Sequence, residues 1–399
     1  MAGEDGVVYG LSSRNNSKVS GYAYDDLRTA RTLLSPYSFR DLEVRNRVVM
    51  APMTRSRAGT ERMPNKLMTE HYLQRADAGL IVTEAVNISE QAIGWLNTPG
   101  IYTDAQAEAW KQVLEPVQAL GTPMFIQLWH MGRASHPSFR KDRSMPVAPS
   151  AVAINSSHRH TPEGTQPYPV PRALETSEIS GVVQQYKRAA ERAKSAGFVG
   201  IELHAANGYL IDQFLQSRTN HRTDQYGGSI ENRYRFLDEI LDAVGAVYPE
   251  ERIGVHISPN GNYADMGSVD FRETFLHVCK RLSERKLAYL HVLDGLTFGF
   301  HEFLPPMSIQ EIRAAYEGPL IANCGYTKET AEAILLMKYA DLVSFGRPYL
   351  ANPDLVDRFK NDWPLSPSIS ALNWYKGEEQ GYLDQPRYKA AQPSAQKVG

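Results

Sequence analysis

The sequence predicts an α/β protein folded as a single (β/α)8 barrel, or TIM barrel, with a loop-rich insertion over the barrel mouth and an irregular N-terminal extension. Eight short apolar runs each precede a longer amphipathic segment, which is the strand-then-helix order of a closed parallel barrel. No G-x-G-x-x-G sequence follows any of these runs, which weakens a doubly wound open sheet as the rival fold. Polar residues stand late in several runs, where barrel enzymes form their sites.

The predicted strands are the eight apolar runs. In chain order they are Arg47–Ala51, Leu80–Ala85, Met124–Trp129, Val199–His204, Ile253–Ser258, Ala288–Leu293, Pro319–Cys324 and Asp341–Phe345. Amphipathic helices are predicted after them, among them Asp104–Leu120, Ser177–Ala196, Ser229–Val247, Phe271–Arg285, Lys328–Met337 and Pro353–Phe359. Ser229 is predicted to cap the helix that begins there, with Glu231 in its first turn.

Three segments lie outside this strand and helix pattern. Residues 1–30 are rich in Gly, Ser, Asn and Tyr and have little periodicity, so we interpret them as an N-terminal extension, with disorder as one interpretation. The barrel is predicted to span residues 31–388, followed by a tail over 389–399. The proline-rich stretch from Gly132 to Thr176 is predicted to be a surface lobe over the barrel mouth.

Composition excludes several classes of partner and compartment. The 43 Lys plus Arg nearly balance the 45 Asp plus Glu, so no nucleic-acid or membrane partner is expected, and a small neutral substrate fits the balance better. No run of eighteen apolar residues and no secretory signal is present. With only Cys279 and Cys324, a disulfide framework is excluded and a cytoplasmic location is expected, with plastid and peroxisome left open. A monomer or a homodimer fits equally well.

Alternation along three strands sends polar side chains to one cavity. In Met124–Trp129 and in Ile253–Ser258, the aliphatic residues fall on the outward face, whereas Gln127 and His256 fall on the inward face. His204 has the same inward phase at the end of its strand. Because the carboxyl ends of barrel strands meet at one mouth, these three side chains should lie close together.

The stretch from His204 to Tyr209 provides three hydrogen-bonding side chains within six residues. His204 and Asn207 can donate to a carbonyl or anionic oxygen, and Tyr209 holds its proton at neutral pH and can act as a general acid. The alternative is a buried, satisfied histidine with a turn-forming asparagine, and a tyrosine that packs at a helix start.

The loops after the last two strands predict a phosphorylated ligand. Asn323-Cys324-Gly325 ends the seventh strand and Gly346-Arg347 follows the eighth, where barrels commonly bind phosphate through loop amides and short helix starts. The alternative is two ordinary turns and a solvated arginine. No H-E-x-x-H, G-x-S-x-G or C-x-x-C motif is present, so a metal, serine hydrolysis and dithiol chemistry are not expected.

Six ordered motifs together resemble the Old Yellow Enzyme family of FMN-dependent ene-reductases, over nearly all of Leu33 to Tyr388. They are A-P-M-T-R at 51–55, T-E-A at 83–85, F-I-Q-L-W-H-M-G-R at 125–133, H-A-A-N-G-Y-L-I-D-Q-F at 204–214, Y-G-G-S-I-E-N-R at 226–233 and F-G-R-P-Y-L-A-N-P-D-L at 345–355. The resemblance implies a barrel flavoprotein in which NADPH reduces FMN and leaves. An α,β-unsaturated aldehyde, ketone or nitro compound then receives hydride from the flavin in a ping-pong reaction.

The resemblance also implies a role for each motif residue. It assigns His204 and Asn207 to the substrate carbonyl oxygen, Tyr209 to protonation of the α-carbon, and Trp129 and Tyr375 to the pocket above the flavin. The residues that it assigns to FMN are Pro52, Met53, Thr54, Ala85, Gln127, His256, Cys324, Gly325, Gly346 and Arg347.

Two positions depart from the family pattern. The family usually has Arg where His256 stands, and its fixed charge favours anionic reduced flavin, so the flavin potential is expected to be lower or more dependent on pH here. It usually has Gly where Cys324 stands, so FMN should bind more weakly or the loop should shift. These departures leave an FMN-binding sensor or store with impaired turnover as one alternative. A barrel isomerase or aldolase on a phosphorylated substrate is the other.

Overall fold

The structure is a closed barrel of eight parallel strands, as predicted. This computed structural model describes residues 18–19, 22–23, 30–296 and 299–388. The barrel strands are β5 (Val48–Met50), β6 (Leu80–Asn87), β7 (Met124–Trp129), β12 (Gly200–Ala205), β13 (Ile253–Ile257), β14 (Tyr289–Leu293), β15 (Leu320–Asn323) and β16 (Leu342–Phe345). Each strand pairs with its neighbours in chain order, and β16 closes the barrel against β5.

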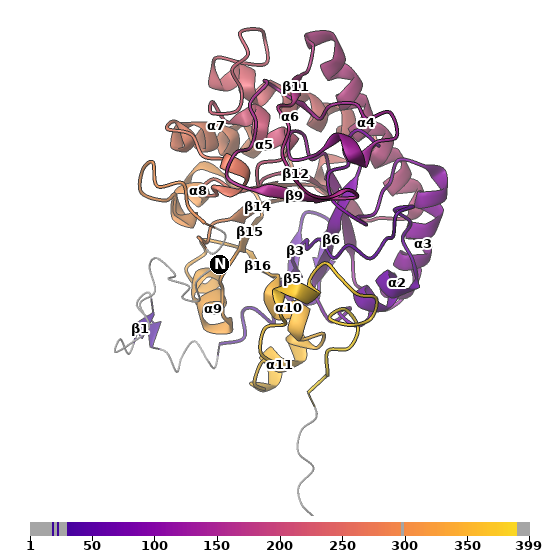
Figure 1. Ribbon diagram of the computed structural model, residues 1–399. Helices are drawn as coiled ribbons and strands as arrows, with labels where there is room; N and C mark the ends of the chain where they lie inside the picture. The colour runs from indigo at the N-terminus through magenta and orange to yellow at the C-terminus, as the bar shows by residue number, and fades with distance from the viewer. Residues whose placement is uncertain (1–17, 20–21, 24–29, 297–298, 389–399) are drawn as a thin grey trace, which may run out of the picture.

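Helices surround the barrel strands (Figure 1). The α-helices are α2 (Lys66–Leu73), α3 (Asp104–Gln118), α4 (Thr176–Ala196), α5 (Leu210–Leu215), α6 (Ile230–Gly245), α7 (Phe271–Ser283), α8 (Ile309–Ala315), α9 (Lys328–Leu336), α10 (Arg347–Ala351) and α11 (Leu355–Asn361). The six helices that the sequence predicts are present with ends shifted by a few residues. Ser229 caps α6 as predicted, because its Oγ accepts the N–H of Asn232 at 3.2 Å, with Glu231 in the first turn.

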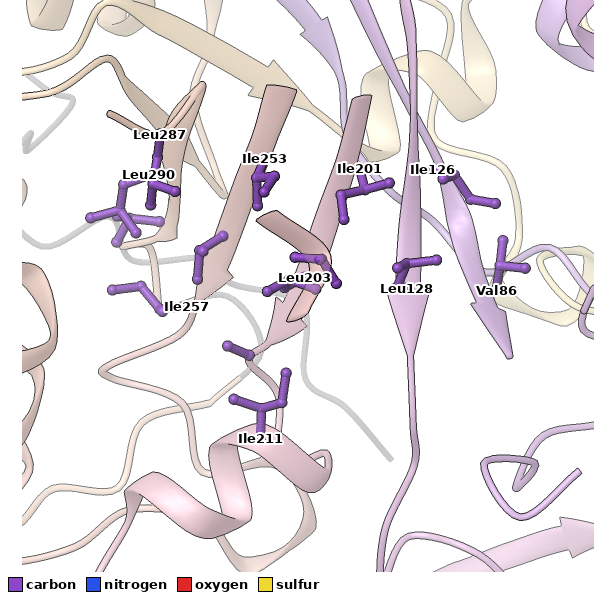
Figure 2. Packing of buried hydrophobic residues seen from close by; sticks show 14 of the residues in the cluster. Val86, Ile126, Leu128, Ile201, Leu203, Ile211, Ile253, Ile257, Leu287 and Leu290 are labelled. Atoms are coloured by element: carbon purple, nitrogen blue, oxygen red, sulfur yellow. The ribbon is translucent and has the colours of Figure 1, made fainter. Parts of the chain in front are cut away.

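Two apolar layers hold the barrel together. The outer layer packs the outward faces of the strands against the helices, and Figure 2 shows Ile126, Leu128, Ile201 and Leu203 within it. The alternation thus places these aliphatic residues as predicted. The strand predicted to begin at Val199 begins instead at Gly200, and Val199 packs against the apolar cluster inside the barrel.

A hairpin closes the amino-terminal end of the barrel. The strands β3 (Tyr37–Phe39) and β4 (Leu42–Val44) pair antiparallel, and Phe39 and Val44 join the inner cluster with Phe125 and Tyr289. Phe39 meets Tyr289 edge to face, with 6.2 Å between the ring centroids. Because this end is filled with apolar side chains, the polar lumen residues occupy the other half of the barrel.

The predicted insertion lies at the barrel mouth. It contains a hairpin of β9 (His158–Thr161) and β10 (Gly164–Pro167) and a parallel pair of β8 (Val147–Ala148) and β11 (Arg172–Ala173). The Asn155 N–H donates to the Asp265 carboxylate at 2.6 Å, which ties the insertion to the loop that follows β13.

Short 3-10 helices occur at Pro137–Phe139, Glu250–Arg252, Tyr263–Asp265 and Ala371–Asn373.

The ends of the chain add little to the barrel. Within the predicted extension the structure describes an antiparallel pair of β1 (Lys18–Val19) and β2 (Tyr22–Ala23), and most of residues 1–30 lie outside the described residues, as does the tail 389–399. The boundaries at 30 and 388 therefore stay a prediction. Among the described residues, no helix combines the length and the apolar character that crossing a membrane requires.

Candidate active site

A cavity of about 490 Å³ opens at the carboxyl end of the barrel strands. Most of the residues predicted for the site line it. They are Pro52, Met53, Thr54, Asn207, Tyr209, His256, Cys324, Gly325, Gly346, Arg347 and Tyr375. Four predicted residues, Ala85, Gln127, Trp129 and His204, lie behind this lining and contact it. The structure therefore brings the predicted site residues together from seven of the eight barrel strands, or the loops after them, and from the C-terminal segment.

One wall of the cavity comes from the loops after β15 and β16. Cys324 and Gly325 have φ values of 88° and 89°, so the chain turns sharply where β15 ends. Consecutive residues in such turns can present backbone N–H groups to an anion. Gly346 supports the same wall, since a Cβ there would lie 3.3 Å from the Met53 Sδ, and Arg347 begins α10 beside it. This wall suits a phosphate group.

Cys324 occupies a strained position in that wall. A φ of 88° lies in the left-handed region, where a side chain costs about 1–2 kcal/mol relative to glycine. The neighbouring loop leaves room for this turn at Gly295, because a Cβ on Gly295 would lie only 2.1 Å from the Cys324 carbonyl oxygen. The loop therefore keeps its tight turn around Cys324.

The opposite wall comes from the turn between β12 and α5. Asn207 and Gly208 have φ values of 56° and 73°, and asparagine and glycine tolerate this conformation best. A Cβ on Gly208 would lie 2.6 Å from the Met266 Cγ, so the turn packs closely. The Asn207 N–H donates to the Ser258 Oγ at 2.7 Å. This hydrogen bond fixes the turn that points Asn207 and Tyr209 into the cavity.

Aromatic rings pack behind and beside that turn. Tyr209 meets His204 and Trp129 edge to face, with 4.9 Å between centroids in each pair. Burial lowers the pKa of His204 well below 6.5, so the imidazole is neutral, and its Nδ1 has no hydrogen-bond partner. Burial raises the pKa of Tyr209 well above 10, so the phenol keeps its proton at neutral pH. Ala85 is buried in the same cluster.

A buried polar network lies beneath the cavity floor. The Gln127 Nε2 donates to the Glu202 carboxylate at 2.7 Å and lies 3.3 Å from the His256 Nδ1. The other Glu202 oxygen lies 2.9 Å from the His291 Nδ1, and the His291 Nε2 lies 2.7 Å from the Ser344 Oγ. Glu202 and His291 are fully buried. The network joins five strands: β7, β12, β13, β14 and β16.

Comparisons with known proteins identify the family. A sequence profile of the NADH:flavin oxidoreductase / NADH oxidase family matches residues 32–366. The chain is 40% identical over 363 residues to a probable flavin mononucleotide-dependent alkene reductase of Leishmania infantum, covering 89% of this chain and 97% of that protein. It is 37% identical over 357 residues to putative 12-oxophytodienoate reductase 11 of Oryza sativa subsp. japonica, with coverage of 89% and 97%.

Solved structures agree with the sequence comparison. Morphinone reductase in complex with tetrahydroNAD superposes with a TM-score of 0.84 at 42% identity and covers 90% of this chain and 98% of that one. The old yellow enzyme homologue from Zymomonas mobilis gives a TM-score of 0.85 at 41% identity, with coverage of 90% and 100%. The chain belongs to the Old Yellow Enzyme family. It is thus a flavin-dependent NADH or NADPH oxidoreductase of the ene-reductase type, with FMN as the family's cofactor.

The residues present fit an Old Yellow Enzyme flavin at the cavity floor. His256 lines the cavity, is 4% exposed, and its Nε2 has no hydrogen-bond partner. Since Gln127 directs one N–H to Glu202 and the other to the His256 Nδ1, the neutral imidazole carries its proton on Nε2. His256 therefore presents a donor, without charge, to a ligand acceptor such as the flavin pyrimidine edge.

The electrostatics of His256 correct one expectation from the sequence. Burial, reinforced by His291, lowers the pKa of His256 to about 3 in spite of the nearby Glu202. The imidazole is therefore neutral throughout the physiological range and cannot make the flavin potential depend on pH there. The other part of the expectation stays a prediction: the flavin potential should be lower than it would be with the fixed positive charge of an arginine at position 256.

Sequence reasoning missed Glu202 and His291 as members of the site. Their ligand atoms lie within 4.8 Å of one another and of those of His256, close enough to surround a cation. However, the His256 and His291 rings stack at 4.3 Å with an angle of 17°, so their in-plane lone pairs do not converge. The group is organised as a hydrogen-bonded network. The inward phase of a charged residue in the middle of β12 is the signal that could have found it.

Proposed function

We propose that the chain is an NADPH-dependent ene-reductase that reduces the C=C bond of α,β-unsaturated aldehydes, ketones or nitro compounds by a ping-pong reaction. The observation that carries this proposal is a single cavity whose two walls differ in chemistry. Gly325, Gly346 and Arg347 on one wall suit a phosphate, whereas Asn207 and Tyr209 on the other suit a substrate oxygen and carbon. A cytoplasmic location fits a chain with only two cysteines, and we expect a monomer or a homodimer.

The family's cofactor would lie between these walls. Pro52, Met53 and Thr54 would run along the ring system, and Ala85, Gln127 and His256 would meet its pyrimidine edge. Cys324, Gly325, Gly346 and Arg347 would hold the phosphate. When bound, FMN supplies the hydride chemistry by accepting hydride from NADPH and passing it to the β-carbon of the alkene.

The substrate would bind by its oxygen at the turn after β12. Among the described residues, no hydrogen bond engages the Asn207 side-chain amide, which is therefore available to the carbonyl or nitro oxygen. His204 is neutral, so it can donate one N–H to the same oxygen without adding a charge. Donors already in place for the developing enolate lower the barrier because they need no reorganisation during the reaction. Trp129 and Tyr375 would shape the space around the alkene.

Tyr209 would deliver the proton to the α-carbon. The phenol lines the cavity and keeps its proton at neutral pH, because burial raises its pKa. A general acid typically contributes about 10²- to 10⁴-fold to the rate of proton transfer. Replacing Tyr209 by Phe removes the proton and leaves the ring packing with Trp129 in place.

The test separates the two half-reactions of purified, FMN-loaded protein. Anaerobic stopped-flow absorbance should record flavin reduction by NADPH, and then flavin reoxidation by 2-cyclohexenone. We expect Tyr209→Phe to slow reoxidation about 10²-fold or more while flavin reduction changes much less. An equal loss in both half-reactions contradicts the proton-donor role, and a protein that binds no FMN contradicts the whole proposal. Parallel titration with NADH tests the preference for NADPH.

Membership of the flavin family overturns the isomerase or aldolase alternative. The flavin sensor or store is still a rival, because His256 and Cys324 both depart from the family pattern. Steady-state NADPH oxidation distinguishes the two. Oxidation that 2-cyclohexenone does not accelerate favours the sensor, whereas oxidation that saturates with the alkene favours the reductase.

A further inference from the structure

Asp212 is a buried carboxyl group just after the site residues Asn207 and Tyr209, and the mechanism described above does not use it. It lies in the first turn of α5, and its side chain is fully buried. Its Oδ2 accepts the N–H of Gly208 at 2.8 Å, and its Oδ1 accepts an N–H of the Gln216 amide at 2.7 Å. Asp212 therefore bonds the residue that stands between the two proposed functional side chains.

The turn that carries these side chains is held at both backbone groups of Gly208. Its N–H donates to Asp212, and its carbonyl oxygen accepts an N–H of the Gln213 amide at 2.7 Å. Helix starts usually satisfy a backbone N–H with the N-cap side chain, but Tyr209 is the N-cap of α5 and makes no such bond. Because Asp212 binds the turn from within the helix, the Tyr209 phenol can face the cavity.

Asp212 and Gln216 form a hydrogen-bonded chain between two backbone N–H groups. At its far end the Gln216 Oε1 accepts the N–H of Gly267 at 2.8 Å, in the loop that follows β13. Both ends of the chain are donors that cannot reverse, so the two side chains between them must supply three acceptors and one donor. One carboxylate and one amide meet that requirement, whereas two amides leave two donors facing each other.

The carboxyl group is kept at this position in spite of the cost of burying its charge. Burial raises the pKa of Asp212 to about 7, although the hydrogen bonds from Gln216 and Gly208 and the charge of Arg133 act to lower it. Carboxyl groups that burial shifts this far cluster at functional sites. The pKa thus agrees with what the hydrogen bonds to the turn indicate.

We propose that Asp212 is a positioning residue for the half-reaction in which the alkene reoxidises the flavin. Its carboxylate fixes Gly208 and so aims Asn207 at the substrate oxygen and Tyr209 at the α-carbon. The inference deepens the proposed function and rests on it. Misplacing a reacting group by about 1 Å can cost about 10²-fold in rate, so a small shift of Gly208 should be measurable.

Two variants test the direction of the hydrogen bonds. Asp212→Asn turns one acceptor into a donor, so two donors meet within the chain. Combining Asp212→Asn with Gln216→Glu reverses the central hydrogen bond and again satisfies both backbone N–H groups. Glu332→Gln is the matched control, because Glu332 is a fully buried carboxyl group on α9, away from the cavity lining, and its Oε2 accepts the N–H of Leu33 at 3.2 Å.

The experiment measures both half-reactions of FMN-loaded protein by stopped-flow absorbance. It is run at about pH 8, where the Asp212 carboxyl group is mainly ionised. Flavin reduction by NADPH and reoxidation by 2-cyclohexenone are recorded for each variant, with Tyr209 present and in the Tyr209→Phe background, as a double-mutant cycle. Calorimetric binding of cyclohexanone, the saturated ketone, to oxidised holoenzyme reports the position of Asn207 without turnover.

We expect Asp212→Asn to slow reoxidation about ten- to a hundred-fold when Tyr209 is present. This effect should shrink about fivefold or more in the Tyr209→Phe background, because displacing the side chain matters less once its proton is gone. Binding of cyclohexanone should weaken, and flavin reduction should change much less. The double variant at 212 and 216 should return each value to within about twofold of the wild type, and Glu332→Gln should leave them unchanged.

Two results overturn positioning by Asp212. One is an equal loss with and without the Tyr209 hydroxyl, together with unchanged binding of cyclohexanone. The other is a double variant that reoxidises as slowly as Asp212→Asn, because then the direction of the hydrogen bonds does not matter. If Asp212→Asn alone binds no FMN, the double variant decides. Failure of both to bind FMN assigns Asp212 to the fold as a whole and overturns the proposal.

Failure of the proposed function gives a different result. In that case 2-cyclohexenone does not reoxidise the flavin of the wild type. Binding of cyclohexanone still tests Asp212, since a loss in Asp212→Asn that the double variant restores supports positioning of Asn207. The two failures are therefore distinguishable.

Discussion

Glu202 should hold the cavity floor together, and replacing it by Gln tests this. The carboxylate accepts a hydrogen bond from Gln127 at 2.7 Å, lies 2.9 Å from the His291 Nδ1, and is fully buried. Removing one partner from such a buried pair costs about 3–5 kcal/mol, because the remaining groups lose their acceptor. At about 2.1 cal/mol/K of unfolding entropy per residue over roughly 350 ordered residues, this lowers Tm by about 4–7 °C.

The assay is thermal unfolding followed by circular dichroism, with FMN at saturation throughout. Glu163→Gln is the matched control, since Glu163 is an exposed carboxylate paired with Arg143, and its Tm should change little. FMN affinity should fall in Glu202→Gln as well, because Gln127 and His256 lose the group that orients them. A Tm and an FMN affinity equal to those of the wild type would refute the reasoning.

The sign of the pH dependence follows from the pKa of Glu202. Burial acts to raise this pKa, but the charge interaction and hydrogen bond with His291 outweigh it, so the pKa is lowered from 4.5. A lowered carboxyl pKa adds stability that is present above the unfolded pKa and is lost as pH falls through the folded value. The Tm difference between Glu202→Gln and the wild type should therefore be constant from pH 6 to 8 and shrink below pH 4.5. A difference that grows in acid contradicts an ionised Glu202.

Two more predictions concern the departures from the family pattern. His256→Arg should raise the reduction potential of the flavin by tens of millivolts, which corresponds to an interaction on the order of 1–4 kcal/mol between a fixed charge and the flavin. It should also change the rate of flavin reduction by NADPH. Because the pKa of His256 is about 3, this increase in potential should be the same from pH 6 to 8. A potential equal to that of the wild type, or an increase that changes with pH in this range, contradicts the prediction. Cys324→Gly should bind FMN up to about tenfold more tightly, since it removes the strain of a φ of 88°. Cys279→Ser is the control in the same fluorescence titration, and equal affinities for wild type and Cys324→Gly would rule out the strain argument.

Much of the site followed from strand phase. A period of two assigns Gln127, His204 and His256 to the lumen, and parallel strands of a closed barrel must bring their carboxyl ends to one mouth. Ser229 at the start of α6 followed from local capping chemistry in the same way. These features depend on residues near in sequence or on the regular geometry of the barrel.

Contacts between distant segments were not predictable from the sequence. Glu202 and His291 lie 89 residues apart and meet only because β12, β13 and β14 are adjacent in the barrel. Ser258 reaches the backbone of Asn207 for the same reason. The inward phase of Glu202 is visible in the sequence, but the partner of each contact is not, since it depends on the register between strands.

The sequence by itself determined the barrel, the inward polar residues and the family, because periodicity and ordered motifs are properties of the chain alone. Only the tertiary structure decided the charges within the site. Burial and neighbouring groups keep His256 neutral and keep Tyr209 protonated. Ionisation depends on the solvent and charges around each group in space, and residues from distant parts of the chain provide both.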